Sequence, residues 1–330
     1  MSHFDAKFSR RGFCASFGAG LFVASLPTLA FGQERKVMAA TGLDTYYVPY
    51  AIAARHKLFQ KYGLELEFKP FDDGSVALDA LLTGNSQMGS ANQVGGLTRW
   101  DKTKGLYIVG VVADSDRLHG VVASSAIQKP EDMVGKTVAF PQFSSGHFLF
   151  NRYVKANNLP IDQIKTVQVA APEMVAAMQR GDIDAFFSWE PWPSRAVELV
   201  QGAHVLAWAK DIGLSFSTMN YYSKALVEDH ELAVAVTKGL IDAADFCENE
   251  PEETIKVASE AFRVPLESAR DTVGKLKFRV EMNKDKMLPE LIEYANFCME
   301  AKLIKAMPDW NDFLRPDIMR DAAPDRLIGW

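Results

Sequence analysis

The sequence lacks the motifs by which many enzymes are recognised. It has no His-Glu-x-x-His zinc motif, no Gly-x-Ser-x-Gly nucleophile elbow and no phosphate-binding P-loop. Its 6 histidines are scattered, and no two cysteines have the spacing of a metal site. These absences predict a protein that is not an enzyme and that needs neither a cofactor nor a metal.

Cysteine is scarce, with 3 in 330 residues. Beyond the N-terminal region only Cys247 and Cys298 remain, each in a segment with the apolar spacing of a helix. In an oxidising compartment the two can form a disulfide if their helices pack together. Two small buried thiols are the alternative, which we favour because the sequence does not place the two sulfurs.

Positively charged residues are fewer than negatively charged ones: the sequence has 36 Lys and Arg and 42 Asp and Glu, for a net charge of -6. Binding to a phosphate backbone needs a basic surface, so this balance argues against nucleic acid as a partner. A small anionic ligand stays open, because it needs only a local pocket.

A hydrophobic run long enough to span a bilayer is missing near the N-terminus. The apolar stretch within residues 18–27 is short and interrupted by Gly and Pro. Arg10 and Arg11 precede it, and small residues follow near Ala30 and Gly32. This order is typical of a twin-arginine signal peptide. We predict that residues 1–32 are such a signal and that the mature protein is periplasmic.

Behind this region the apolar residues alternate between strand and helix spacing. Residues 36–40 and 64–68 are typical of strands, and residues 48–59 and 76–82 of helices. A similar succession runs from residue 137 to residue 179. Alternation of this kind predicts parallel strands joined by crossover helices. Its repetition predicts two α/β lobes, each with its own sheet.

The pattern changes after Gly213. A predicted strand at 215–222 is followed by long amphipathic helices with no sheet of their own, at 227–247, 251–262, 266–276 and 286–304. We infer that these helices return to pack on the first lobe. The predicted first lobe holds residues 33–118 and 213–330, and the second lobe holds 119–212. Two chain crossings, near 117–121 and 209–216, are what a hinged pair of lobes requires.

Ligands of open α/β sheets bind beyond the carboxyl ends of the strands. Segments at these ends, from both lobes, supply polar and aromatic side chains to one cleft. The candidate ligand-binding residues are Thr41, Tyr46, Tyr47, Ser75, Asn92, Ser144, Ser145, His147, Glu173, Trp189, Glu190 and Trp192.

Two of these segments carry the most information. In Ser144-Ser-Gly-His147 a helix begins directly after a strand, and its first N–H groups and hydroxyls can form an anion site. An ordinary serine cap is the alternative. Trp189 and Trp192 flank Glu190 and either cover a core or line a site. Glu190 is awkward in a core, because a buried carboxylate needs a partner.

Together these residues resemble the periplasmic solute-binding proteins of ABC importers in the nitrate/sulfonate/taurine class. The resemblance implies a type II periplasmic binding protein fold. It also implies that the Ser-Ser-x-His helix start contacts an anionic head group, as in alkanesulfonate binders. Four phrases carry the resemblance, at 134–140, 144–147, 181–185 and 189–191.

The resemblance implies a monomeric receptor that captures a small organic anion and delivers it to a permease in the inner membrane. Two departures concern the ligand. Gln87 stands where the family usually has Asp, and the Asp72-Asp73-Gly74 loop is more acidic than a pure sulfonate site implies. The alternatives are a sensor subunit and an enzyme of the same fold in thiamine or menaquinone precursor synthesis. An export signal fits poorly with the enzyme.

Overall fold

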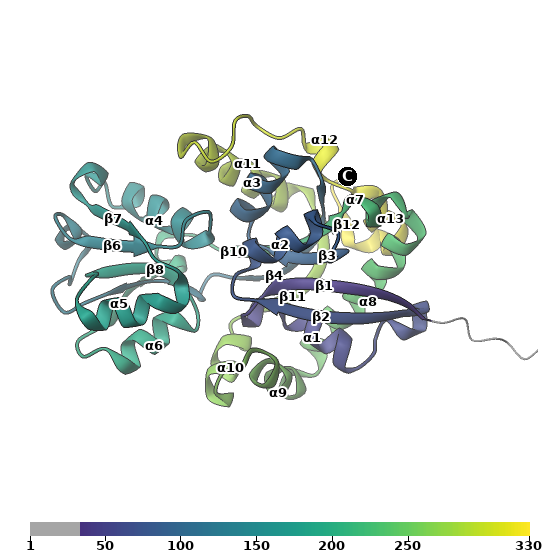
Figure 1. The fold of residues 1–330 in the computed structure, drawn as a ribbon, viewed down its shortest axis with the longest axis horizontal. Helices are drawn as coiled ribbons and strands as arrows, with labels where there is room; N and C mark the ends of the chain where they lie inside the picture. Colours follow the sequence, from purple (N-terminus) through teal and green to yellow (C-terminus); the bar gives the residue numbers. More distant parts are fainter. Residues whose placement is uncertain (1–33) are drawn as a thin grey trace, which may run out of the picture. The chain divides into compact units, whose positions relative to one another are not determined.

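The fold is given by a computed structural model, which describes residues 34–330. Within these residues the strands form two separate sheets, and helices pack against both (Figure 1). The predicted fold class, two α/β lobes, is therefore confirmed. The predicted signal peptide, residues 1–32, lies outside the described residues.

The first lobe is built on a sheet of 7 strands in the order β12-β11-β4-β10-β3-β1-β2. Strand β1 pairs in parallel with β2 and β3, whereas β10 is antiparallel to β3 and β4. The predicted parallel strands joined by crossover helices are confirmed for β1, β2 and β3, and the sheet as a whole is mixed because β10 runs antiparallel. The strands are β1 (Arg35–Gly42), β2 (Leu64–Phe71), β3 (Met88–Ala91), β4 (Leu106–Ser115), β10 (Phe216–Ser223), β11 (Lys277–Asn283) and β12 (Leu327–Ile328).

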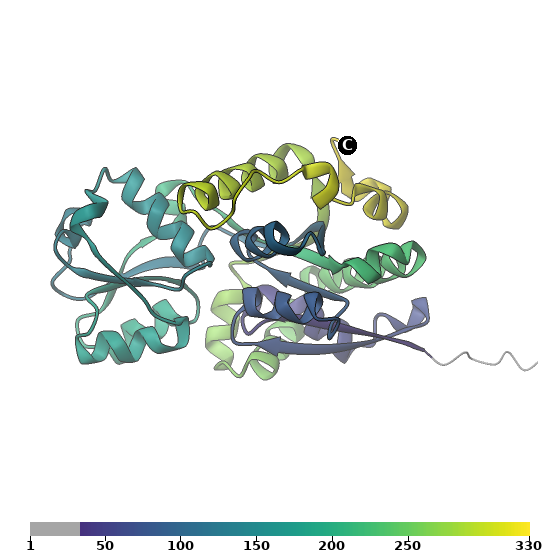
Figure 2. The same cartoon turned by 45° about the horizontal axis from the view of Figure 1, so that its top comes forward.

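The second lobe has a sheet of 5 strands in the order β7-β6-β8-β5-β9. Strand β6 is parallel to β7 and β8, while β5 is antiparallel to β8 and β9. This sheet lies between α4 on one side and α5 and α6 on the other (Figure 2). Its strands are β5 (His119–Ala123), β6 (Thr137–Phe140), β7 (Lys165–Gln168), β8 (Ala185–Trp189) and β9 (His204–Trp208), and its helices are α4 (Ser145–Ala156), α5 (Met174–Arg180) and α6 (Trp192–Leu199).

Helices of the first lobe come from both ends of the chain. Helices α2 and α3 pack together, and α1 packs against α8 and α9. The helices are α1 (Val48–Arg55), α2 (Gly74–Leu82), α3 (Gln93–Thr103), α7 (Lys224–Glu228), α8 (His230–Asn249), α9 (Pro251–Phe262), α10 (Leu266–Val273), α11 (Lys284–Glu300), α12 (Trp310–Phe313) and α13 (Pro316–Ala322).

The C-terminal segment also contributes to the sheet, which the sequence analysis did not expect. Strand β11 lies between α10 and α11 and pairs with β4. Its side chains alternate, with Phe278, Val280 and Met282 buried, which is the period of a strand. The predicted helix at 227–247 is interrupted at Asp229, whose carboxylate accepts from the backbone N–H of Leu232 and begins α8.

The chain passes between the sheets twice, from β4 to β5 after Ser115 and from β9 to β10 after Trp208. Cys247 and Cys298 are both buried free thiols. Among residues 34–330 no helix is long and apolar enough to cross a bilayer.

Candidate ligand-binding site

Residues of both lobes line one small cavity. Its volume of about 20 Å³ has room for roughly one water molecule. A wider cleft of about 600 Å³ shares Asp73 with it and opens between the start of α2 and the ends of β6 and β7. The cavity is lined by Asp44, Tyr46, Tyr47, Asp73, Asn92, Phe216, Ser217 and Thr218 of the first lobe and by His119, Ser145 and Trp189 of the second.

His119, the first residue of β5, lines the cavity and contacts both lobes. The hydroxyl of Tyr46 lies 3.3 Å from its Nδ1, and the hydroxyl of Ser145 lies 2.8 Å from its Nε2. Its ring stacks on Phe216 with the centroids 3.8 Å apart. Burial lowers the pKa of His119 to about 3, so the imidazole is neutral and one ring nitrogen donates while the other accepts. His119 therefore joins the two lobes through neutral hydrogen bonds.

The two serines at the start of α4 have different tasks. Ser144 is the N-cap, since its hydroxyl accepts from the backbone N–H of Gly146 at 3.1 Å. Ser145 is turned to the cavity and contacts His119. Gly146 lets the helix approach β8, because a Cβ there would lie 2.6 Å from the carbonyl oxygen of Phe187. The serine cap that the sequence allowed is therefore present at Ser144, and the adjacent Ser145 lines the cavity.

The residues of the Trp-Glu-Pro-Trp segment, 189–192, also differ in their places, since only Trp189 lines the cavity. Trp189 ends β8, is buried and lines the cavity, 6.1 Å from His119 between ring centroids. Glu190 turns inward to a local partner, and the backbone N–H and the hydroxyl of Ser194 both donate to it. Burial raises the pKa of Glu190. Trp192 is half-buried in α6 beside Arg195 and does not line the cavity.

The first lobe brings three loops to the cavity. Asp44 caps the 3-10 turn η1 (Thr45–Tyr47), since its Oδ1 accepts from the backbone N–H of Tyr46 at 3.0 Å. Tyr47 packs on the start of α2, where a Cβ at Gly74 would lie 2.5 Å from the tyrosine hydroxyl. This close approach requires glycine at position 74.

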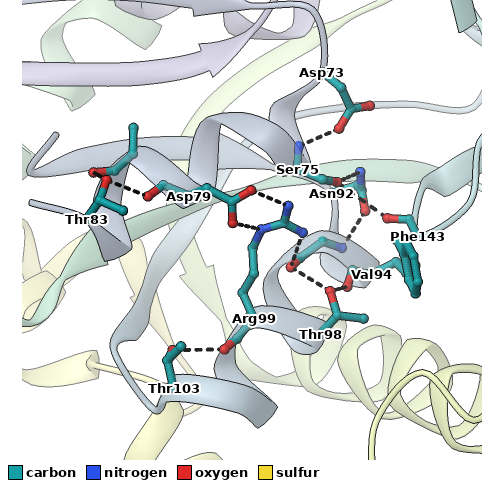
Figure 3. A network of polar contacts seen from close by, with 12 residues as sticks. Asp73, Ser75, Asp79, Thr83, Asn92, Val94, Thr98, Arg99, Thr103 and Phe143 are labelled. Atoms are coloured by element: carbon teal, nitrogen blue, oxygen red, sulfur yellow. Dashed lines mark hydrogen bonds and ion pairs between the residues drawn. The ribbon is translucent and has the colours of Figure 1, made fainter. Parts of the chain in front are cut away.

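A hydrogen-bonded network fixes the start of α2 (Figure 3). Asp73 caps the helix by accepting from the backbone N–H of Ser75, and Asn92 donates to the Ser75 hydroxyl at 3.2 Å. The same hydroxyl lies 3.4 Å from the carbonyl oxygen of Phe143 in the second lobe. Ser75 therefore connects the two lobes at the wider cleft, which both residues line.

The remaining candidates lie beside the cavity or away from it. The Thr41 hydroxyl, at the end of β1, donates to the carbonyl of Gly42. His147 stacks on Phe140, and burial lowers its pKa to about 4. Glu173 is exposed at the wider cleft. Of the twelve predicted residues, the cavity lining includes Tyr46, Tyr47, Asn92, Ser145 and Trp189.

Ser217 lines both this cavity and a second cavity of about 230 Å³, which Glu290 of α11 also lines. The Gln93 amide and the Ser217 hydroxyl donate to Oε1 of Glu290 at 2.6 and 2.7 Å. Burial raises the pKa of Glu290 to about 7, and the charges of Asp114 and Glu293 add to the rise.

This raised pKa predicts a pH dependence of stability. The folded state keeps the Glu290 proton to about pH 7, whereas the unfolded chain releases it near pH 4.3. The contribution to stability is therefore lost as pH rises between these values, by at most about 1.4 kcal/mol per pH unit. Glu290→Gln keeps the acceptor oxygen but cannot ionise. The free energy of unfolding of this variant, measured with urea between about pH 5 and pH 8, should therefore rise relative to that of the wild type as pH rises. Parallel curves for the two proteins would contradict this assignment.

A family model, described as the NMT1-like family, matches residues 33–261. The chain belongs to this family. A taurine-binding periplasmic protein of Escherichia coli K12 is 26% identical to this NMT1-like chain over 226 residues, which are 67% of the chain and 69% of that protein.

Solved structures share the fold of this NMT1-like protein. The periplasmic aliphatic sulphonate binding protein SsuA from Escherichia coli has a TM-score of 0.73 at 19% identity, covering 85% of this chain and 92% of that one. The periplasmic nitrate-binding protein NrtA from Synechocystis PCC 6803 has a TM-score of 0.72 at 16% identity, covering 88% of both chains. The two-lobed fold of this NMT1-like protein is therefore that of periplasmic binding proteins.

Sequence reasoning missed several residues that line the cavity of this NMT1-like protein. His119 lies directly after the first crossing between the sheets, and Phe216, Ser217 and Thr218 lie directly after the second. Both crossings were predicted from the sequence, but none of the candidate residues lay at them. A crossing joins the two lobes at their facing ends, so its flanking residues were a usable signal.

Proposed function

We propose that this NMT1-like protein is the solute-binding receptor of an ABC importer. It binds a small organic anion, a sulfonate or a related acid, and delivers it to a permease in the inner membrane. The protein works as a periplasmic monomer, exported by residues 1–32. Its first lobe comprises residues 33–118 and 213–330, and its second lobe comprises residues 119–212. The similarity to a taurine-binding periplasmic protein supports this proposal.

The observation that carries the proposal is the convergence of both lobes on one polar, aromatic cavity. Tyr46 and Trp189 offer flat apolar walls from opposite lobes, and Ser145, His119 and Thr218 offer neutral polar atoms between them. Micromolar capture needs about -8 kcal/mol. A few hydrogen bonds within aromatic walls are sufficient for that affinity. The cavity of about 20 Å³ has room for roughly one water, so the ligand enters when the two lobes move apart about the crossings between the sheets.

Capture fits this cavity better than catalysis. Ser145 and His119 are 2.8 Å apart, which is the spacing of a nucleophile and its base. A general base works best when its pKa is near the operating pH. The pKa of His119 is lowered to about 3, so the imidazole takes up a proton poorly at neutral pH. The pair therefore serves as a hydrogen-bonding wall of the binding site.

Ligand binding is tested by thermal shift on the protein from Gln33 onward. The panel holds taurine, alkane- and arylsulfonates, nitrate, aromatic carboxylates and aminopyrimidines. A ligand that binds only the folded protein raises Tm by mass action. A shift with one class identifies the head group. Turnover of any bound compound would instead favour an enzyme.

Paired variants test the placement of the site. Trp189→Ala and Ser145→Ala should each weaken binding of the identified ligand by about tenfold or more in titration calorimetry, since each removes a cavity wall or a polar contact. Trp192→Ala and Ser144→Ala are the matched controls. Trp192 lies outside the cavity, so its substitution should leave affinity unchanged. Ser144→Ala removes a helix cap, so it should lower the free energy of unfolding by about 1 kcal/mol with little change in ligand affinity. Equal effects of variant and control would show that the site lies elsewhere.

A further inference from the structure

The ligand cavity is acidic. Asp44 and Asp73 line it, and no Lys or Arg is among its lining residues in the described chain. The backbone N–H of Tyr46 donates to Asp44, and that of Ser75 donates to Asp73 at 2.6 Å. Asp44 is 8% exposed and Asp73 is partly buried, and hydrogen bonds from neighbouring groups of the same turn do not balance the charge of such carboxylates, which favours a cation or a proton.

The nearest candidate cation is already engaged. Arg99 of α3 forms a two-pronged pair with Asp79 of α2, with N–O distances of 2.8 and 2.9 Å. Figure 3 shows this pair apart from the carboxylate of Asp73. Burial raises the pKa of Asp44 to about 8 and also raises the pKa of Asp73. Asp44 therefore holds a proton near neutral pH until a cation takes its place.

The walls of the cavity suit a positive charge. Tyr46, Tyr47, Trp189 and Phe216 all contribute rings to the lining. The face of an aromatic ring is negative and attracts an ammonium group, by about 2 kcal/mol or more where water is excluded. Rings and carboxylates together are the surroundings that a cation prefers.

Thr218 supplies an independent sign of a missing polar partner. It lines the cavity and is only 5% exposed. Its Oγ1 has no hydrogen-bond partner within residues 34–330. Buried hydroxyls are almost always paired, so a polar group of the ligand is expected at this atom. An ammonium group has N–H donors for both the hydroxyl and a carboxylate.

We propose that the ligand carries a protonated amine, which Asp44 and Asp73 bind within the aromatic walls of the cavity. This inference rests on the proposed function and narrows its ligand class to acids that also bear an amine. The acidic group of the ligand then faces Ser145 and the start of α4. Anions without an amine, such as nitrate and simple alkanesulfonates, leave Asp44 and Asp73 without a cation, so they bind more weakly than acids that bear an amine.

Matched ligand pairs test this inference on the protein from Gln33 onward. The pairs are taurine with ethanesulfonate, 3-aminopropanesulfonate with propanesulfonate, and 4-(aminomethyl)benzoate with 4-methylbenzoate. We expect one amine-bearing member to bind at least about tenfold more tightly than its partner, which corresponds to about 1.4 kcal/mol. Tighter binding of an amine-free member overturns the inference but leaves the receptor proposal standing. Binding of no member contradicts both.

Charge-removing variants test the two residues. Asp44→Asn keeps the acceptor for the backbone N–H of Tyr46, and Asp73→Asn keeps it for Ser75. Each should lower affinity for the amine-bearing ligand by about tenfold or more and leave affinity for its amine-free partner unchanged or higher. Asp72→Asn is the control, because Asp72 is exposed and lies outside the cavity lining. Equal losses in the control and the two variants, or no loss in either variant, overturn the assignment, and thermal melts verify that each variant folds.

Discussion

His119→Ala is expected to lower the free energy of unfolding by about 3–5 kcal/mol. The substitution removes the ring that stacks on Phe216 and leaves a cavity in its place. It also leaves the hydroxyls of Tyr46 and Ser145 buried without their shared partner, at a cost of about 1–3 kcal/mol each. Urea unfolding near pH 7.5 measures the difference. At that pH His119 is neutral, so no change of its charge contributes.

His119→Phe separates the two causes of this loss. Phenylalanine keeps a ring against Phe216 but offers no hydrogen bond to Tyr46 or Ser145. We expect it to recover part of the stability and none of the ligand affinity. A loss below about 1 kcal/mol for His119→Ala would mean that the two lobes do not meet through this residue.

The sequence predicted the Trp189 segment as a site, and the structure shows the limit of that prediction. Trp189 was predicted to line the cleft because ligands of open α/β sheets bind beyond the carboxyl ends of the strands, and Trp189 ends β8. The next residues turn away, because Glu190 finds its partners in Ser194 and Trp192 begins α6. Such a turn depends on contacts between residues that no periodicity encodes.

The acidic side of the cavity shows a different limit. The sequence showed that the loop with Asp72 and Asp73 is unusually acidic. It did not show which of the two carboxylates points inward. In the structure Asp73 is the helix cap and lines the cavity, while Asp72 is exposed. Strand β11 was missed although Phe278, Val280 and Met282 alternate in the sequence, and its place in the first sheet depends on its pairing with β4. Tertiary contacts decided both cases.

Phe148→Ala is expected to be about as destabilising as His119→Ala, at about 3–5 kcal/mol. Phe148 of α4 is 2% exposed and stacks on Tyr294 of α11 with the ring centroids 3.9 Å apart. It also meets Phe216 and Phe297 edge-to-face. Its loss opens a cavity that three surrounding rings have little freedom to fill. Urea unfolding at neutral pH measures the change.

An exposed ion pair between the same two helices provides the control, because it joins the helices without apolar burial. Lys155 donates to Glu300 at 2.6 Å, and both residues are exposed. Exposed pairs contribute about 0–1 kcal/mol, so Lys155→Ala should change the free energy of unfolding by no more than that. Phe148→Leu should fall between the two, since it keeps much of the apolar volume. If Lys155→Ala cost as much as Phe148→Ala, charge rather than aromatic packing would hold α4 against α11, and Ser145 would owe its place in the cavity to those charges.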